Sequence, residues 1–582
     1  MSEDRDSAQG QRRRWLGLPL HPFRPALLDC VATYDRRAFS ADLVAGVTVG
    51  LVALPLAMAF AIASGLKPEA GIFTAIIAGF LTSLLGGSKV QIGGPAGAFI
   101  VIVYGILAQY GLANLLISTI MAGVLLFVMG LTRIGSLIRF IPVAIIIGFT
   151  NGIAVLIALS QVKDFLGLPI EKMPADFFGA TRAILNSIGA VHWPSFALAL
   201  ACLGLIVAWP RFGALLQPAN AGGEPARSRL QLVTRLPATL VALVLATVAT
   251  VALSLPVDTI GSRFGGIPTG LPSFTLPALS WETARNLVAP TITIALLGAV
   301  ESLLCARVAD GMTGDRHDPN QELMAQGIAN FVTPFFGGIP ATGTIARTTV
   351  NVRTGARTPI SGMVHAATLL LIVLVAAPLA THVPLAALAG ILMYVAWNMG
   401  EWREFSRLRQ FSNQYRTVML STFLLTVVVD LTVAIEFGMV LAALFFIYRV
   451  SSLTTVERVT DEALSPGVFA YRLYGSLFFG SVGKLEWLLE ETERGAPRVL
   501  VLDLHQVINV DTTGLDMLDV VRKALEKRGA ALVLCDANEQ PLSLFRRSGF
   551  LERLGAPNLQ PDLAGALARS REVLDEVRQG LR

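Results

Sequence analysis

Charged residues are scarce in this sequence. Asp, Glu, Lys and Arg make up 15% of the 582 residues, whereas they make up about 25% of an average soluble protein. Apolar runs near the length that a helix needs to cross a bilayer recur up to about Val450, and the chain beyond that point is more polar. The sequence therefore predicts a polytopic α-helical membrane domain followed by a soluble domain.

Cysteine and histidine are also few. The four cysteines, Cys30, Cys202, Cys305 and Cys535, are scattered singly, which argues against a disulfide framework or a zinc site. None of the six histidines has metal-ligand spacing, although His365 lies within an apolar segment. We expect no metal and no cofactor, and we find no nucleophile–base constellation typical of an enzyme.

The N-terminus is polar and rich in Arg, and no short apolar segment with a small-residue cleavage site follows it, so we expect no signal peptide. The net charge of +5 is weak evidence for a nucleic-acid partner, because Lys and Arg in a membrane protein mostly record topology. We therefore expect no nucleic-acid partner.

Apolar segments divide the membrane domain into fourteen predicted spans, two of them short enough to be half-helices. The fourteen predicted segments are 42–64, 70–86, 95–109, 113–131, 137–160, 195–210, 235–255, 287–310, 322–337, 341–354, 359–380, 384–400, 415–433 and 434–450. Basic residues fall in every second loop if the Arg-rich N-terminus is cytoplasmic. This alternation predicts an even number of spans and a cytoplasmic C-terminus.

A glycine-rich motif occurs twice inside these apolar surroundings. Gly93-Gly94-Pro95-Ala96-Gly97-Ala98 precedes the third predicted span, and Gly337-Gly338-Ile339-Pro340-Ala341-Thr342-Gly343 precedes the tenth. A Gly-Gly pair breaks a helix and a following Pro favours the start of a new one. Free N–H groups and the positive end of the dipole at such a start suit an anion.

The two motifs occupy the third position of each set of seven spans. An odd number of spans per repeat inverts the second repeat, and paired helix breaks at corresponding positions point to the midplane site of a secondary transporter. The alternative, that Gly and Ala only permit close helix packing, is weaker for a pair of motifs than for one.

The predicted domains are a basic arm at 1–40, a transport domain at 41–450, a linker at 451–460, an α/β domain at 461–570 and a tail at 571–582. In the α/β domain, residues 498–503 and 531–535 predict buried parallel strands, and 481–494, 513–528 and 541–548 predict helices between strands.

The sequence resembles the SulP/SLC26 anion transporters. The matching runs include residues 42–46 and 54–60, the Gly-Gly-Pro break, 320–323, 326–330 and 345–351, and they occur in the family's order. The tail resembles a STAS domain at 499–503 and 509–515. This resemblance implies fourteen spans as 7+7 inverted repeats, a core and a gate domain, a homodimer, and elevator-like alternating access.

The resemblance also implies where the anion binds, between the starts of spans three and ten and facing span one. The implied substrate-binding residues are Leu56, Phe60, Ala96, Gly97, Ala98, Thr344, Ile345, Ala346 and Arg347. The alternatives for Arg347 stay open: it attracts the anion, or it marks the inner end of span ten.

Glu301 is the clearest acidic residue deep inside an apolar segment. A carboxylate buried there costs several kcal/mol, so it is expected to be protonated, paired or functional. The resemblance implies a coupling-ion role for Glu301 and for Cys305, one turn away. Sodium-coupled bicarbonate members resemble this chain in having an acid here, but they place hydroxyl groups where this chain has Ala96 and Cys305. A thiol is a poor ligand for a hard cation, which favours a proton over sodium. The alternative is a structural pair between Glu301 and Arg347.

In the tail, Asp511, Thr512 and Thr513 occupy the stretch that carries a phosphorylated hydroxyl in soluble STAS relatives. Here Thr replaces the usual Ser, and a helix cap by these residues is the preferred explanation of the pattern. The alternative is a regulatory role, in which one of these hydroxyl groups is phosphorylated. A cytosolic protein partner of this domain is a further alternative.

We therefore predict a secondary active transporter of a small inorganic oxyanion, with sulfate first and proton coupling. The chain is expected to lie in the bacterial inner membrane as a multi-pass protein with both termini cytoplasmic. Bicarbonate or C4-dicarboxylate symport with sodium or protons, an uncoupled anion channel or exchanger, and a membrane-anchored signalling protein acting through the tail remain as alternatives. A channel has no need of a buried titrating acid, which makes Glu301 the discriminating residue.

Overall fold

The computed structural model describes residues 14–579 except 16–17, 32–33, 137–141, 171–172, 175, 216–236, 267–269, 271–273, 275–284, 430 and 461–463. Residues 1–13, 16–17 and 32–33 of the predicted basic arm therefore lie outside the described residues, as do Arg139, Arg227, Arg229, Arg235 and Asp430. The chain forms two compact units, Met1–Met439 and Val440–Arg582, and the division falls within α19 (Leu431–Leu453). The predicted domain boundaries stay predictions.

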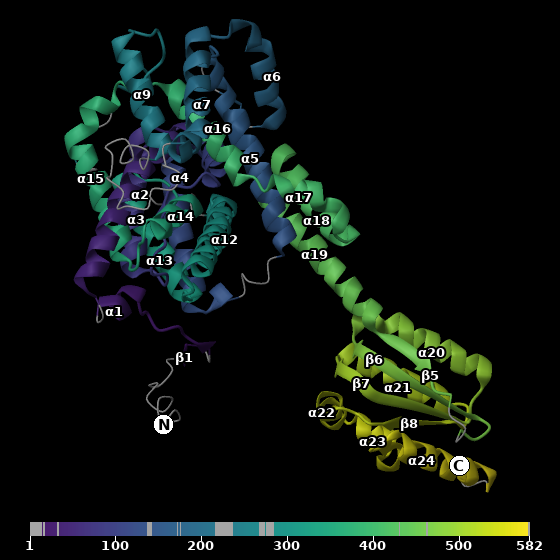
Figure 1. The fold of residues 1–582 in the computed structure, drawn as a ribbon. Helices are drawn as coiled ribbons and strands as arrows, with labels where there is room; N and C mark the ends of the chain where they lie inside the picture. Colours follow the sequence, from purple (N-terminus) through teal and green to yellow (C-terminus); the bar gives the residue numbers. More distant parts are fainter. Residues whose placement is uncertain are drawn as a thin grey trace. The chain divides into compact units, whose positions relative to one another are not determined.

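The first unit consists almost entirely of helices (Figure 1). Its principal helices are α2 (Arg36–Ala63), α3 (Pro68–Leu85), α4 (Phe99–Leu131), α5 (Val143–Leu166), α6 (Phe177–Ser187), α7 (Trp193–Leu215), α9 (Ala238–Ala252), α12 (Val288–Thr313), α13 (Pro319–Val332), α14 (Ile345–Arg353), α15 (Ile360–Ala380), α16 (Leu385–Met399) and α18 (Asn413–Val428), followed by α19. Shorter helices, α1 (Ala26–Val31), α10 (Ile260–Phe264) and α17 (Trp402–Arg407), lie between them.

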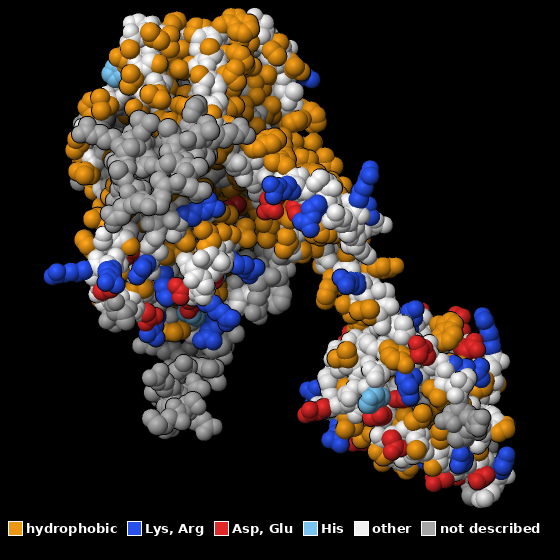
Figure 2. All heavy atoms as spheres, in the orientation of Figure 1, with side chains coloured by type: hydrophobic (Ala, Val, Ile, Leu, Met, Phe, Trp, Pro, Cys, Tyr) orange, Lys and Arg blue, Asp and Glu red, His pale blue; other side chains and the backbone are white. Residues whose placement is uncertain are grey.

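Each predicted apolar segment coincides with one of these helices or with half of one. Segments three and four are the two halves of α4, which is interrupted at Gly111 by non-helical backbone with φ 83° and ψ 172°. By length and hydropathy alone, six of the described helices could cross a bilayer, or seven if the bent pair α6–α7 counts as one span. Figure 2 shows hydrophobic side chains over much of the drawn face of this unit, as lipid contact requires.

The helices pack as two bundles within the first unit. Helices α2, α3, α4, α12, α13, α14 and α15 pack mainly on one another, and α5, α7, α9, α16 and α18 pack mainly on one another. Small residues permit the closest approaches: a Cβ at Gly123 of α4 would lie 2.7 Å from Gly327 O of α13. This division matches the predicted core and gate domains.

The prediction that Pro95 and Pro340 begin the two broken helices was wrong by a few residues. Helix α4 begins at Phe99 and α14 at Ile345, and short strands β3 (Gly93–Gly94) and β4 (Thr342–Gly343) precede them. The two strands pair with each other although Gly93 and its partner Gly343 are 250 residues apart in the sequence. This pairing keeps the chain extended where a Pro in isolation favours a helix start. Local sequence cannot reveal such a pairing.

The second unit is an α/β domain with a five-stranded sheet. Strands β5 (Thr455–Arg458), β6 (Val468–Leu477), β7 (Val499–Val510), β8 (Ala531–Cys535) and β9 (Leu559–Gln560) lie in that order, and only the β5–β6 pair is antiparallel. Helices α20 (Val482–Gly495), α21 (Thr512–Glu526), α22 (Glu539–Arg547), α23 (Phe550–Leu554) and α24 (Leu563–Arg578) complete the domain. The predicted linker 451–460 is regular structure instead, because it holds the end of α19 and the paired strand β5.

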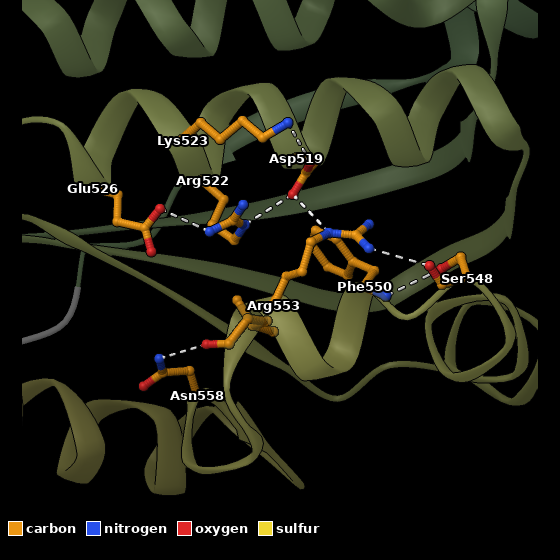
Figure 3. Close-up of polar contacts among 9 residues, drawn as sticks. Asp519, Arg522, Lys523, Glu526, Ser548, Phe550, Arg553 and Asn558 are labelled. Atoms are coloured by element: carbon orange, nitrogen blue, oxygen red, sulfur yellow. Dashed lines mark hydrogen bonds and ion pairs between the residues drawn. The ribbon is translucent and has the colours of Figure 1, made fainter.

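An ion-pair cluster ties α21 to α23 in this domain (Figure 3). The Asp519 carboxylate accepts from Arg522 Nε at 2.8 Å and pairs with Lys523 Nζ at 2.9 Å and Arg553 Nε at 3.5 Å. Burial by itself would raise the pKa of Asp519, but the hydrogen bonds and charges of Lys523 and Arg522 outweigh it and lower that pKa. The ionised carboxylate therefore stabilises the folded domain above the ordinary Asp pKa, and this contribution is lost as the pH falls through the lowered value.

Replacing Asp519 with Asn should destabilise the α/β domain by about 1–3 kcal/mol, since three cations lose a buried partner. Hydrogen exchange of the α21 amides in the full chain at pH 7 measures this effect. Glu526→Gln is the matched control: its carboxylate also pairs with Arg522, at 2.9 Å, but is 65% exposed, so it should change the stability by less than about 1 kcal/mol. Equal protection in D519N and the native chain would contradict the prediction.

Candidate anion-binding site

The two glycine-rich motifs meet in the centre of the first unit. Strands β3 and β4 pair antiparallel, with Gly93 opposite Gly343 and Gly94 opposite Thr342. Both the backbone N–H and the Oγ1 of Thr344 donate to Ile92 O at 2.9 Å. Thr348 Oγ1 accepts from Ile92 N at 3.0 Å. The motifs are thus bonded to each other, and helices α4 and α14 both begin within a few residues of this crossing.

Neither helix start is capped by a side chain. Ala98 is the N-cap of α4 and Thr344 is the N-cap of α14, and neither side chain accepts a hydrogen bond from its helix. The first N–H groups of a helix have no partner inside that helix, and together with the macrodipole they carry about half a positive charge. Two such starts beside one crossing create a positive field without a bound cation.

The wall opposite the helix starts comes from several helices. A Cβ placed on Gly97 would lie 3.6 Å from Phe60 Cε1 of α2, 3.3 Å from Ile157 Cδ1 of α5 and 3.6 Å from Met399 Sδ of α16. Leu56 and Phe60 are buried on α2, and Pro55 lies inside that helix. Because α5 and α16 belong to the second bundle, the candidate site lies where the two bundles meet.

Exposure varies across the predicted substrate-binding residues. Ala96, Ala98 and Thr344 are buried, Gly97 and Ile345 are half-buried, and Ala346 is exposed. The start of α14 is therefore accessible from one side, as entry of a solute requires. Ile157 and Met399 join the predicted set, and nothing in their apolar surroundings distinguishes them in the sequence.

Arg347 lies deep in the molecule, with 1% of its surface exposed. Its Nη2 donates to Pro95 O at 3.3 Å, whereas its Nε and Nη1 have no hydrogen-bond partner among the described residues. The alternative that Arg347 only marks the inner end of span ten is wrong, because such a residue would reach water. Its guanidinium instead lies against the backbone of the β3 strand.

Glu301 lies on α12 and is 7% exposed. It makes no hydrogen bond or ion pair with another described residue, so the structural pair between Glu301 and Arg347 is not formed. One turn along α12, Cys305 is buried and its Sγ lies 3.2 Å from Thr348 Oγ1 of α14. An unpaired carboxyl group thus stands on the helix that packs against β4 and α14.

A buried carboxylate that the sequence analysis did not single out lies nearby. Glu322 of α13 accepts hydrogen bonds from Gly87 N at 2.9 Å and Ser88 N at 3.1 Å, in the loop that leads to β3. Its other oxygen accepts from Gln326 Nε2 at 3.3 Å and from Ser302 Oγ at 3.4 Å. Glu322 lies in one of the runs that resemble the family, and this is the signal that could have identified it.

No group of three or more His, Cys, Asp or Glu side chains in the described part of the chain is arranged to hold a metal ion. In the second unit, Asp511 is the N-cap of α21 and accepts from Gly514 N at 2.8 Å, and Thr512 and Thr513 form the first turn of that helix. Asp511 therefore caps α21, as the helix-cap interpretation expects.

Two domain profiles match the chain. The sulfate permease family covers residues 39–422 and the STAS domain covers residues 462–566. Among relatives, the chain is 42% identical over 528 residues to the candidate sulfate transporter YvdB of Bacillus subtilis (strain 168), covering 90% of this chain and 96% of YvdB. It is 30% identical over 546 residues to the bicarbonate transporter BicA of Picosynechococcus, covering 88% of this chain and 92% of BicA.

Solved structures show the same architecture. The transmembrane domain of a cyanobacterial BicA aligns with a TM-score of 0.60 and 32% identity over 69% of this chain and 98% of that one. The inward-facing murine Slc26a9 anion transporter aligns with a TM-score of 0.81 and 17% identity over 97% of each chain, which shows a shared fold. The chain belongs to the sulfate permease (SulP/SLC26) family of membrane transporters and carries a C-terminal STAS domain.

Proposed function

We propose that this protein is a secondary active transporter of a small inorganic oxyanion, with sulfate as the first candidate. The observation that carries the proposal is the bonded crossing of β3 and β4, which sets two uncapped helix starts and a buried guanidinium around one point. Such a site attracts negative charge and offers backbone N–H groups and a guanidinium as hydrogen-bond donors to an oxyanion.

We propose proton coupling through Glu301. An acid that is buried and unpaired on α12 can take up and release a proton as the site becomes accessible to each side. The neighbouring Ala96 and Cys305 supply no hydroxyl or carboxylate oxygen, which a sodium ion would require.

Uptake is therefore expected to be independent of sodium. Replacing external sodium with choline at constant ionic strength should leave the initial rate of proton-driven sulfate uptake by proteoliposomes unchanged. A rate that falls at least about tenfold without sodium would assign the acid at position 301 to a sodium site instead, and the protein would then be a sodium-coupled symporter.

We propose elevator-like movement of one helical bundle against the other. We also propose that the protein is a homodimer in the bacterial inner membrane and that the N- and C-termini of each chain are cytoplasmic. Support for the movement comes from the position of the site at the junction of the bundles, where Gly97 lies beside Ile157 of α5 and Met399 of α16. A solute held there changes its accessibility if the bundles slide.

A competition panel tests the substrate. Purified protein should bind labelled sulfate, and unlabelled sulfate should displace it more effectively than bicarbonate, succinate, chloride or nitrate at pH 6 and pH 8, with and without sodium. Bicarbonate is the second candidate because of the 30% identity to BicA, and stronger displacement by bicarbonate would replace sulfate with it. Stronger displacement by succinate would indicate a C4-dicarboxylate transporter.

Flux measurements separate a coupled transporter from a channel and from a signalling protein. A channel would pass anions down their gradient but could not accumulate them against it in response to protons. A role of Asp511, Thr512 and Thr513 in binding a cytosolic partner is a further proposal. It would gain support if deletion of residues 460–582 left transport intact and abolished a partner interaction.

A further inference from the structure

A second basic side chain is buried beside the helix crossing. His365 of α15 has no exposed surface, and neither its Nδ1 nor its Nε2 has a hydrogen-bond partner in the described part of the chain. A buried imidazole normally donates from one nitrogen and accepts at the other. Two unmet ring nitrogens therefore leave His365 able to bind a proton or a ligand.

A hydrogen bond joins α14 to α15 near Arg347 and His365. Asn351 Nδ2 of α14 donates to Ser361 Oγ of α15 at 2.8 Å. Arg347 precedes Asn351 by one turn and His365 follows Ser361 by one turn, so each basic side chain lies one turn beyond this hydrogen bond on its own helix. The positive charge of Arg347 is close enough to act on the imidazole of His365.

Both side chains also reach the same short stretch of β3. A Cβ at Gly94 would lie 2.6 Å from Arg347 Nη1. A Cβ at Gly79 of α3 would lie 3.1 Å from Gly93 O and 3.7 Å from His365 Nε2. The Gly93–Gly94 backbone, which leads directly into the start of α4, is therefore flanked by Arg347 and His365.

No carboxylate in the described residues neutralises this pair. Among the helices around α15, α2 carries Asp42, which accepts from Thr358 Oγ1 near the loop before α15, and α3 carries Glu69, whose partner is Lys67. Helices α9 and α16 carry no charged residue, and Arg353 of α14 is exposed. Arg36 and Arg37 of α2 are exposed, so among the described residues of these helices Arg347 is the charged group that acts on His365.

We propose that Arg347 and His365 together neutralise a divalent oxyanion, and that His365 takes up one proton from solution when the anion binds and releases it when the anion leaves. A protonated His365 beside Arg347 is repelled in the empty site, whereas an anion of charge −2 balances one permanent and one acquired positive charge. A monovalent anion is balanced by Arg347 alone. This inference rests on the proposed anion transport and assigns its substrate class.

Proton uptake on binding tests the inference in the purified full-length protein. The E301Q variant removes the other proposed proton site, so sodium sulfate added to it in a weakly buffered solution should still take up about one proton per bound anion, and sodium nitrate should take up none. In the double variant E301Q/H365Q the uptake with sulfate should disappear. His382, in the loop after α15, provides the control: E301Q/H382Q should behave as E301Q does.

The E301Q measurement keeps the test decisive even if His365 variants do not fold. Sulfate binding to E301Q without proton uptake would overturn the role of His365 while anion transport stands, and so would uptake that persists in E301Q/H365Q. Binding of bicarbonate or nitrate but not sulfate would overturn the divalent specificity alone. A native protein that binds no anion of the panel would contradict the proposed function, and this inference would fall with it.

Discussion

Replacement of Glu301 with Gln should remove one proton's share of the proton-driven accumulation of the anion and leave only the share of the proton that we propose for His365. Gln keeps the size of the side chain and its polarity but cannot exchange a proton, and Glu301 has no hydrogen-bond or ion-pair partner among the described residues that Gln would disturb. One coupled proton moving down a gradient of one pH unit supplies about 1.4 kcal/mol, which corresponds to about tenfold accumulation. The variant should lose this factor and still exchange labelled for unlabelled anion across the membrane.

The measurement is sulfate uptake by proteoliposomes with and without an imposed inward proton gradient, followed by counterflow at equal pH. Glu436→Gln is the matched control, since Glu436 also lies in a membrane helix, α19, but is exposed. It should accumulate sulfate as the native protein does. Accumulation by E301Q that responds to the gradient as strongly as accumulation by the native protein would remove proton coupling from Glu301.

The sequence predicted the helices well because each one depends on a local property, the length of an apolar run. It predicted helix starts less well where distant contacts decide them. Pro95 and Pro340 stand at plausible starts, but the chain stays extended there because Gly93 and Gly94 pair with Gly343 and Thr342. No local pattern reports a partner so far along the chain.

Within the candidate site, the sequence identified the residues that are chemically conspicuous. Glu301 and Arg347 stand out because charge is rare in a membrane segment. Ile157 and Met399 do not, because an apolar residue in an apolar span carries no sign of which face it presents. The sequence also left open whether Glu301 pairs with Arg347, which is a question of three-dimensional distance.

The backbone at Gly94 offers the sharpest test of the crossing itself. Gly94 has φ of 149°, a conformation that residues with a side chain rarely adopt. A Cβ there would also lie 2.6 Å from Arg347 Nη1 and 3.5 Å from the Cα of Ala75. Gly94→Ala is thus expected to cost about 1–3 kcal/mol in backbone strain and to push the guanidinium from its place beside β3.

Because the displaced group is the one buried cation at the helix starts, the G94A variant should bind sulfate at least about tenfold more weakly than the native protein, equivalent to about 1.4 kcal/mol. Equilibrium binding to detergent-purified protein that elutes as a single species measures this loss. Gly105→Ala is the control, because Gly105 lies in α4, the helix that follows β3, and a Cβ there meets no atom within 4 Å. G105A should bind sulfate normally and be equally or more stable, since Ala favours a helix over Gly by about 1 kcal/mol. Native affinity in a folded G94A protein would show that the anion does not depend on Arg347 or on the shape of the crossing, and the proposed site would have to lie elsewhere.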